Sequence, residues 1–177
     1  AHLFSVGLLL DAALVPGGLR AGGLRDDDAG LEAFATAMLT TDTRLKAATA
    51  TIMLPSDDGV SRRPVRVSGV ATGVGIRHPR MATMIALILT DAAAEPALLA
   101  SLLRDAVAAT FEQTSVDGDT STNDTVFLLA SGAADVDRPR PGSPAAAELG
   151  AAITAVCRSL ARQQAADGEG ATTLITC

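Results

Sequence analysis

A run of nine residues, 81–89, is apolar at every position except Thr83, and it restricts the fold of this chain more than any other feature. A segment so short and so evenly apolar fits a strand that is buried within a sheet. Two earlier segments, residues 49–54 and 65–70, alternate in polarity, and the turn-rich residues 55–59 join them. The sequence therefore predicts a sheet in which residues 81–89 form a central strand.

Two amphipathic helices are predicted after these strands. Pro96 begins a helix that extends to about residue 111, and Ser143 with Pro144 supplies the cap and first turn of another. The apolar face of the second helix consists of Leu149, Ile153, Val156 and Leu160. Helices that pack on a sheet predict an α/β (α+β layered) fold, with residues 1–177 as one domain.

Four less regular segments also have a predicted conformation. Asp28 is expected to cap a short helix over residues 31–40. Residues 3–10 are predicted to form a short buried strand, and residues 172–176 a strand at the end of the chain. The linker 135–144 contains three prolines and is expected to be exposed.

Charge and composition exclude several classes of partner. The chain has a formal charge of −6, and its single lysine is Lys46, whereas nucleic acids and anionic membranes bind clustered basic residues. No apolar run reaches the about 18–20 residues that span a bilayer, so we expect a cytoplasmic protein. His2, His78, Cys157 and Cys177 lack the spacing of a metal site, and Cys157 is predicted to be a buried thiol.

Three segments are unusual for structural filler. They are RHPRMATMIALILTD at 77–91, VDGDTSTND at 116–124 and DGEGA at 167–171. Taken one at a time, each has a structural interpretation: Thr83 opens a strand, the polar segment forms a turn and a helix cap, and Glu169 is a solvated turn residue.

Taken together and in order, these motifs resemble the ornithine acetyltransferase (glutamate N-acetyltransferase) family. The matching motifs are TTDT at 40–43, MATM at 81–84 followed by LTDA at 89–92, DGDTSTNDT at 117–125, and DGEGA at 167–171. The resemblance extends from about Ser5 to the last residue. It implies a sheet-and-helix fold that resembles N-terminal-nucleophile enzymes, of which this chain holds a middle part.

The resemblance implies that the chain cuts itself between Ala82 and Thr83 into an α piece, 1–82, and a β piece, 83–177. Thr83 then has a free α-amine, whose reference pKa of about 7.7–8.0 lets it take the proton of the adjacent hydroxyl. As nucleophile, Thr83 would accept an acetyl group from N-acetylornithine and pass it to glutamate, a step of arginine biosynthesis. This double displacement through an acetyl-threonine ester needs no cofactor.

The resemblance also implies substrate-binding residues. Thr40 and Thr41 would help to hold the substrate, and Glu169 would contact its α-amino group. Thr72 stands where the family has a substrate-contacting lysine, so an ammonium group is missing at this position. The implied partners are small amino-acid substrates, and the cleaved α and β pieces are expected to form an oligomer.

Two departures from the family pattern keep other functions open. Gly7 would supply an oxyanion-hole amide, but Val6 beside it has no side-chain donor, and losing one such donor costs about 10²–10³ in rate. Together with Thr72, this departure is compatible with a non-catalytic relative or assembly subunit. The loss of the lysine at Thr72 is also compatible with a related N-terminal-nucleophile amidohydrolase or aminopeptidase that passes the acyl group to water.

Overall fold

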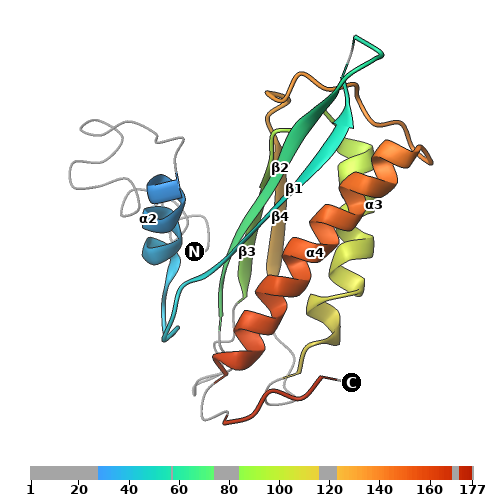
Figure 1. The fold of residues 1–177 in the computed structure, drawn as a ribbon. Helices are drawn as coiled ribbons and strands as arrows, with labels where there is room; N and C mark the ends of the chain where they lie inside the picture. Colours follow the sequence, from blue (N-terminus) through green and yellow to red (C-terminus); the bar gives the residue numbers. More distant parts are fainter. Residues whose placement is uncertain (1–27, 57, 74–83, 116–122, 169–171, 177) are drawn as a thin grey trace.

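The computed structural model describes residues 28–56, 58–73, 84–115, 123–168 and 172–176 (Figure 1). In chain order, the elements are α2 (Asp28–Met38), β1 (Lys46–Pro55), β2 (Arg62–Thr72), β3 (Ile85–Thr90), α3 (Pro96–Ala108), the 3-10 helix η2 (Phe111–Gln113), β4 (Thr125–Ala130) and α4 (Pro144–Ala166). Helices and strands lie in separate layers, which confirms the predicted α/β class.

The strands form one sheet in the order β1-β2-β3-β4. β1 pairs antiparallel with β2, and β2 pairs antiparallel with β3. β4 is parallel to β3, so the chain must cross over between them, and α3 lies on that crossover. β3 is central, as the apolar run predicts, although it begins at Ile85, and residues 81–83 lie outside the described part of the chain.

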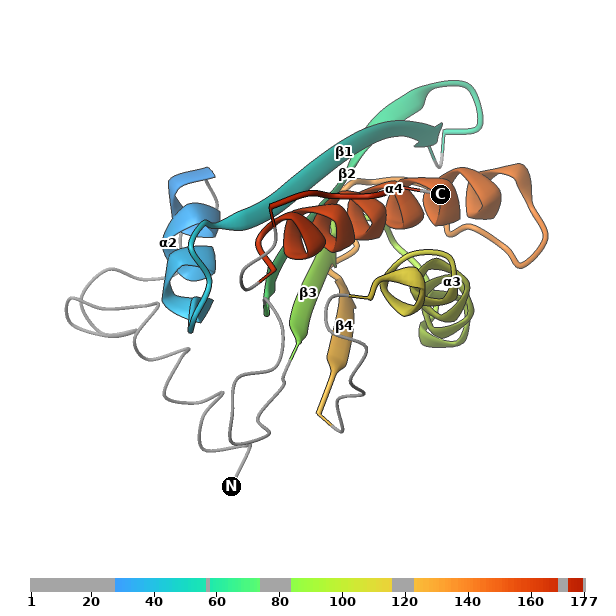
Figure 2. The same cartoon turned by 90° about the horizontal axis from the view of Figure 1, so that it is seen from below.

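The helices cover the two faces of the sheet unequally. α4 packs on β1 and β2 and α3 packs on α4, while α2 contacts β1 and β2 from the other side (Figure 2). The larger core lies between the sheet and α4, and its fully buried members include Leu54, Val65, Val67, Ile88, Leu149, Ile153 and Leu160. A second, smaller core joins Ala35 and Met38 of α2 to Val70 of β2.

The predicted starts of α3 and α4 agree with the structure, whereas the predicted end of α3 does not. The Ser143 hydroxyl caps α4 by accepting the Ala146 N–H at 3.2 Å. α3 stops at Ala108, short of residue 111, because the Thr110 hydroxyl donates to the Ala106 carbonyl at 2.6 Å and the chain turns into η2. α2 includes Asp28 as a helical residue and ends at Met38, so the predicted cap and end are both corrected by two to three residues.

Two other predictions are corrected by the structure. Residues 172–176 are exposed and belong to no strand, because a strand needs a neighbour that takes its hydrogen bonds. The linker 135–144 is exposed at most positions, but Val136 and Pro139 are buried, and Val136 forms a β-bridge with Ser56. The predicted strand at residues 3–10 lies outside the described residues.

Cys157 is fully buried on α4, as predicted, and burial raises the pKa of its thiol to about 11. None of the helices in the described ranges is both long and apolar enough to cross a membrane.

Candidate functional site

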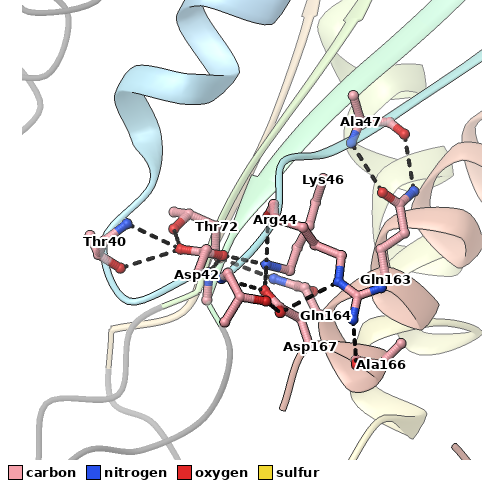
Figure 3. Close-up of polar contacts among 12 residues, drawn as sticks. Thr40, Asp42, Arg44, Lys46, Ala47, Thr72, Gln163, Gln164, Ala166 and Asp167 are labelled. Atoms are coloured by element: carbon pink, nitrogen blue, oxygen red, sulfur yellow. Dashed lines mark hydrogen bonds and ion pairs between the residues drawn. The ribbon is translucent and has the colours of Figure 1, made fainter. Parts of the chain in front are cut away.

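Segments that are distant in the sequence meet at one end of the sheet. Lys46 at the start of β1 pairs with Ala71 near the end of β2. Thr72 pairs with Ile85 at the start of β3, and Ile85 pairs in turn with the first residue of β4. The C-terminal end of α4 reaches the same place, because Asp167 contacts Lys46 from 121 positions away (Figure 3). Parts of the motifs at 40–43, 81–84, 117–125 and 167–171 therefore lie at this end of the sheet.

Lys46 connects the segments that meet at this end of the sheet. Its side chain has no exposed area, although lysine is among the residue types that are least often buried. The ammonium group donates to Asp42 Oδ1 at 2.5 Å, to Asp167 Oδ2 at 2.6 Å and to the Arg44 carbonyl at 3.4 Å. An ammonium group has three N–H donors, so each has an acceptor. We call Asp42, Lys46 and Asp167 the ionic cluster.

Asp42 connects the TTDT motif to the end of β2. Its Oδ2 accepts the Thr72 hydroxyl at 2.6 Å and the Thr40 backbone N–H at 3.1 Å. Its Oδ1 accepts the Gly73 backbone N–H at 3.0 Å. Gly73 has a φ of 120°, a conformation that favours glycine, so a larger residue there would strain the contact.

Asp167 connects the end of α4 to the same motif. Its Oδ2 accepts the Thr43 backbone N–H at 3.1 Å, and the Thr43 hydroxyl donates to its Oδ1. The Nε of Arg44 lies 3.5 Å from Oδ1, but Arg44 is 61% exposed and therefore contributes little. A carboxylate at a helix C-terminus is on the unfavourable side of the helix dipole, so the buried ammonium of Lys46 is needed to stabilise it.

Burial raises the pKa of both carboxyl groups of the ionic cluster, and the hydrogen bonds that they accept outweigh this effect. Donors from Lys46, Thr72 and Thr40 lower the pKa of Asp42 below its usual value. Donors from Lys46 and Thr43 lower the pKa of Asp167 to about 2. Both groups are ionised at neutral pH and have no proton to give, so the cluster fits a positioning role better than acid–base catalysis.

Two glutamines on the last turns of α4 extend these contacts to the strand backbone. Gln163 donates to the Ala47 carbonyl at 3.0 Å and accepts the Ala47 N–H at 3.2 Å, as a neighbouring strand would do at the edge of β1. Gln164 is buried and donates to the Thr72 carbonyl at 3.0 Å. The end of α4 is therefore held to both β1 and β2.

The residue that follows Thr83 is also held in place. The Met84 N–H donates to Asp124 Oδ1 at 2.8 Å, and the Met84 carbonyl accepts the Thr125 N–H at the same distance. Asp124 and Thr125 belong to the DGDTSTNDT motif. The end of this motif thus holds the backbone N–H and carbonyl of Met84, the residue that follows Thr83 in the sequence.

The described residues include three of the predicted site residues. Thr40 is exposed and contacts Asp42 through its amide and its hydroxyl, the latter at 3.4 Å. Thr41 is exposed next to it. Thr72 is 4% exposed and gives its hydroxyl proton to Asp42, so this proton is already used inside the protein.

The remaining predicted site residues, Gly7, Ala82, Thr83 and Glu169, lie outside the described part of the chain, as does Val6. Their roles stay predictions. Met84, which follows Thr83, and Gly168, which precedes Glu169, are described and lie at the end of the sheet where the motifs meet.

Reasoning from the sequence missed the ionic cluster and the two glutamines. One signal was present: Lys46 is the single lysine in a chain with 14 basic Lys and Arg residues, and it follows TTDT by three positions. The aspartates of TTDT and DGEGA belonged to recognised motifs but had no assigned role. Among the described residues, no group of three His, Cys, Asp or Glu side chains is arranged to hold a metal ion.

The fold and this end of the sheet define a layered α/β protein in which parts of four motifs lie at the same end of one sheet, two of them in contact with a buried lysine. The ArgJ family model matches residues 9–177, which is nearly the whole sequence. The chain belongs to the ArgJ family.

Individual relatives agree with this assignment. The chain is 48% identical to the arginine biosynthesis bifunctional protein ArgJ of Synechococcus sp., over 81% of this chain and 33% of that protein. It is also 48% identical to the ArgJ protein of Lactococcus lactis, over 80% of this chain and 34% of that protein. The chain thus spans about a third of the length of the curated relatives that it matches.

A solved structure of similar sequence is the arginine biosynthesis bifunctional protein ArgJ from Bacillus halodurans. The identity is 42%, the match covers 49% of this chain and 40% of that chain, and the TM-score is 0.47.

Proposed function

We propose that this chain is the part of an acetyltransferase that contains the nucleophile. In this proposal the Ala82–Thr83 bond is cut, and Thr83 moves an acetyl group from N-acetylornithine to glutamate through an acetyl-threonine ester. The observation that carries the proposal is that parts of the four motifs lie at one end of the sheet, in a chain that belongs to the ArgJ family.

The contacts of Met84 support the role of Thr83. A nucleophile must be held in a reactive geometry, and the hydrogen bonds of Met84 to Asp124 and Thr125 hold the backbone of the residue next to Thr83. After the cut, the α-amine of Thr83 would be both the new chain terminus and the base that takes the proton of its own hydroxyl. Ala82 before it is small, which leaves room for the hydroxyl to attack the preceding carbonyl.

The proposed reaction balances without a coenzyme. In the self-cleavage step the Thr83 oxygen attacks the Ala82 carbonyl carbon, the peptide C–N bond breaks, and water then opens the ester. In each catalytic cycle the same oxygen takes acetyl from N-acetylornithine, which leaves as ornithine. The amine of glutamate then attacks the acetyl carbon, the ester C–O bond breaks, N-acetylglutamate leaves, and the Thr83 oxygen regains a proton. The proton removed from the hydroxyl goes to the α-amine and then to the leaving amine.

The first test is the mass of the purified chain. We expect pieces that correspond to residues 1–82 and 83–177, and we expect a Thr83→Ala variant to stay whole because it has no hydroxyl. Thr51→Ala is a matched control, since Thr51 is an exposed threonine on β1, and this variant should cut like the natural sequence. A natural chain that stays whole through long incubation would contradict the proposal.

The second test separates transfer from hydrolysis. Acetyl transfer from N-acetylornithine to glutamate supports the proposed acetyltransferase. Release of acetate without transfer supports an N-terminal-nucleophile hydrolase, with which Thr72 in place of the lysine is compatible. Cutting followed by neither reaction supports a non-catalytic relative or assembly subunit.

The proposal also includes the setting of the reaction. The substrates are small amino-acid molecules, the cleaved α and β pieces stay together as an oligomer, and the protein works in the cytoplasm. Site residues that belong to the proposal are Gly7 for the oxyanion and Thr40, Thr41, Thr72 and Glu169 for the substrate.

A further inference from the structure

We propose that Lys46 is a positioning residue of the site: its buried ammonium bridges Asp42 and Asp167 and so locks the segment with Thr40 and Thr41 to the end of α4 that leads into Glu169. The inference rests on the proposed function, because Thr40, Thr41 and Glu169 are substrate contacts only within that proposal. Lys46 itself is not expected to touch the substrate.

The geometry of the ionic cluster supports this role. Asp42 and Asp167 have side chains that are 0% and 1% exposed, and both point at the same nitrogen atom. Two carboxylates this close repel each other strongly when they are buried, and only a cation between them allows both to stay ionised. The position of Lys46 thus determines how far apart the two segments lie.

The cluster also connects directly to the backbone on each side. Asp42 holds the N–H groups of Thr40 and Gly73, and Asp167 holds the N–H group of Thr43. Thr40 is the first residue of TTDT, Gly73 leads toward Thr83, and Asp167 is two positions before Glu169. A shift of the ammonium would therefore move the segment with Thr40 and Thr41, the residue after Thr72, and the residues before Glu169. Met84, the neighbour of Thr83, has other contacts and would not move.

The ionic cluster also contains residues from both sides of the proposed cut. Asp42, Lys46 and Gly73 belong to residues 1–82, whereas Asp167 belongs to residues 83–177. The contact between Lys46 and Asp167 at 2.6 Å would then join two separate chains at the site. Because it is buried, salt would screen it much less than a surface pair.

The central experiment compares KM and kcat for Lys46→Met. Met84, the residue after Thr83, is held by a different set of contacts, so the positioning role predicts that KM for N-acetylornithine rises about 10- to 100-fold while kcat per folded molecule changes less. Arg62→Met is the matched control, since it removes an exposed ion pair with Glu148 at 2.6 Å. The control should leave KM unchanged.

A second variant separates positioning from stability. Lys46→Met leaves two buried carboxylates together, and it should lower Tm. Lys46→Met with Asp167→Asn removes one of the two charges and should recover most of the lost Tm. If Lys46 positions the site, KM stays raised in this double variant. If Lys46 only supports the fold, KM returns to the natural value with Tm, and this result would overturn the proposal.

Amide hydrogen exchange tests the bridge independently of activity. In the natural chain the N–H groups of Thr43 and Gly73 should exchange slowly, and in Lys46→Met both rates should rise at least about tenfold, while the amide of Ile88 in β3 stays protected. If the natural chain is inactive but gives these exchange results, the proposed function is contradicted, whereas the bridge from Lys46 to Asp42 and Asp167 is supported. Unchanged exchange at Thr43 and Gly73 in the variant would refute the bridge itself.

Discussion

At the scale of single residues, the ionic cluster concentrates charge in a place where charge is costly. Removing an ion from water costs several kcal/mol, and a buried pair recovers this cost only with good geometry and further hydrogen bonds. Asp42 and Asp167 meet this condition, because each accepts hydrogen bonds from backbone and hydroxyl groups besides Lys46. Within the described residues, no buried side-chain nitrogen or oxygen lacks a partner.

The depressed pKa of Asp167 predicts a loss of stability in acid. Its pKa is about 2 in the folded chain and near 3.8 in the unfolded chain, so between these values the unfolded chain binds more protons. The stabilisation is therefore complete above pH 3.8 and is lost as pH falls toward 2. Asp42 adds to this trend in the same direction. Lys46 contacts both carboxylates, and the exposed Arg44 lies near Asp167 only.

The measurement is Tm as a function of pH for the natural chain and for Asp167→Asn. The variant should be less stable at neutral pH, but its Tm should fall less between pH 5 and about 2.5 because one titrating carboxylate is gone. Asp105→Asn, which changes an exposed carboxylate on α3, should keep the slope of the natural chain. Parallel curves for the natural chain and Asp167→Asn would contradict the assignment.

At the scale of helices and strands, most of the fold could be predicted from the sequence. Apolar periodicity and the signals at Ser143 and Pro96 located α4 and α3, because a cap and a proline act locally. The prediction of a strand at 172–176 was wrong, since strand pairing depends on a partner that the local sequence does not encode. The end of α3 was also missed, because the bond from Thr110 to Ala106 competes with a regular helix.

The site was less predictable than the fold. Resemblance to a family identified the motifs, but nothing in the local pattern around Lys46 shows that its partner is 121 positions away. Contacts of this kind follow from the strand register and from the length of α4, which bring Asp167 to the start of β1. A single lysine in an arginine-rich chain was the one local sign that this position differs from the other basic positions.

Close packing between α4 and the sheet leads to a prediction for Gly69 of β2. A Cβ atom at this position would lie 2.8 Å from Ile88 Cδ1 and from Val156 Cγ1, and 2.9 Å from Leu160 Cδ1. Val156 is branched and stiff, so the helix must move away to make room. We expect Gly69→Ala to lower the free energy of unfolding by about 1–3 kcal/mol.

Urea unfolding followed by circular dichroism measures this effect. Arg66→Ala serves as the control, because successive strand residues point to opposite faces and Arg66 is exposed on the face away from α4. The control should change the free energy of unfolding by no more than about 0.5 kcal/mol. A Gly69→Ala chain as stable as the control would show that α4 packs less tightly than these distances require.

At the scale of the whole molecule, the proposed cut falls between strands that are neighbours in one sheet. β1, β2 and α2 belong to residues 1–82, whereas β3, β4, α3 and α4 belong to residues 83–177. The two sets share the ladder between β2 and β3, and α4 of the second set packs on β1 and β2 of the first. Neither set of elements forms the larger core by itself, because the residues of that core come from both sets.

This division predicts that the two pieces stay together after the bond is cut. Denaturing mass spectrometry should show two masses, while native mass spectrometry should show one complex with the mass of the chain plus one water. High salt should not separate the pieces, because the shared ladder and the apolar core are insensitive to screening. The pieces should unfold in a single urea transition, since each completes the core of the other. Separation of the pieces by size exclusion at neutral pH without denaturant would mean that the sheet does not hold them together, and the β2–β3 pairing would then have to form only in the uncut chain.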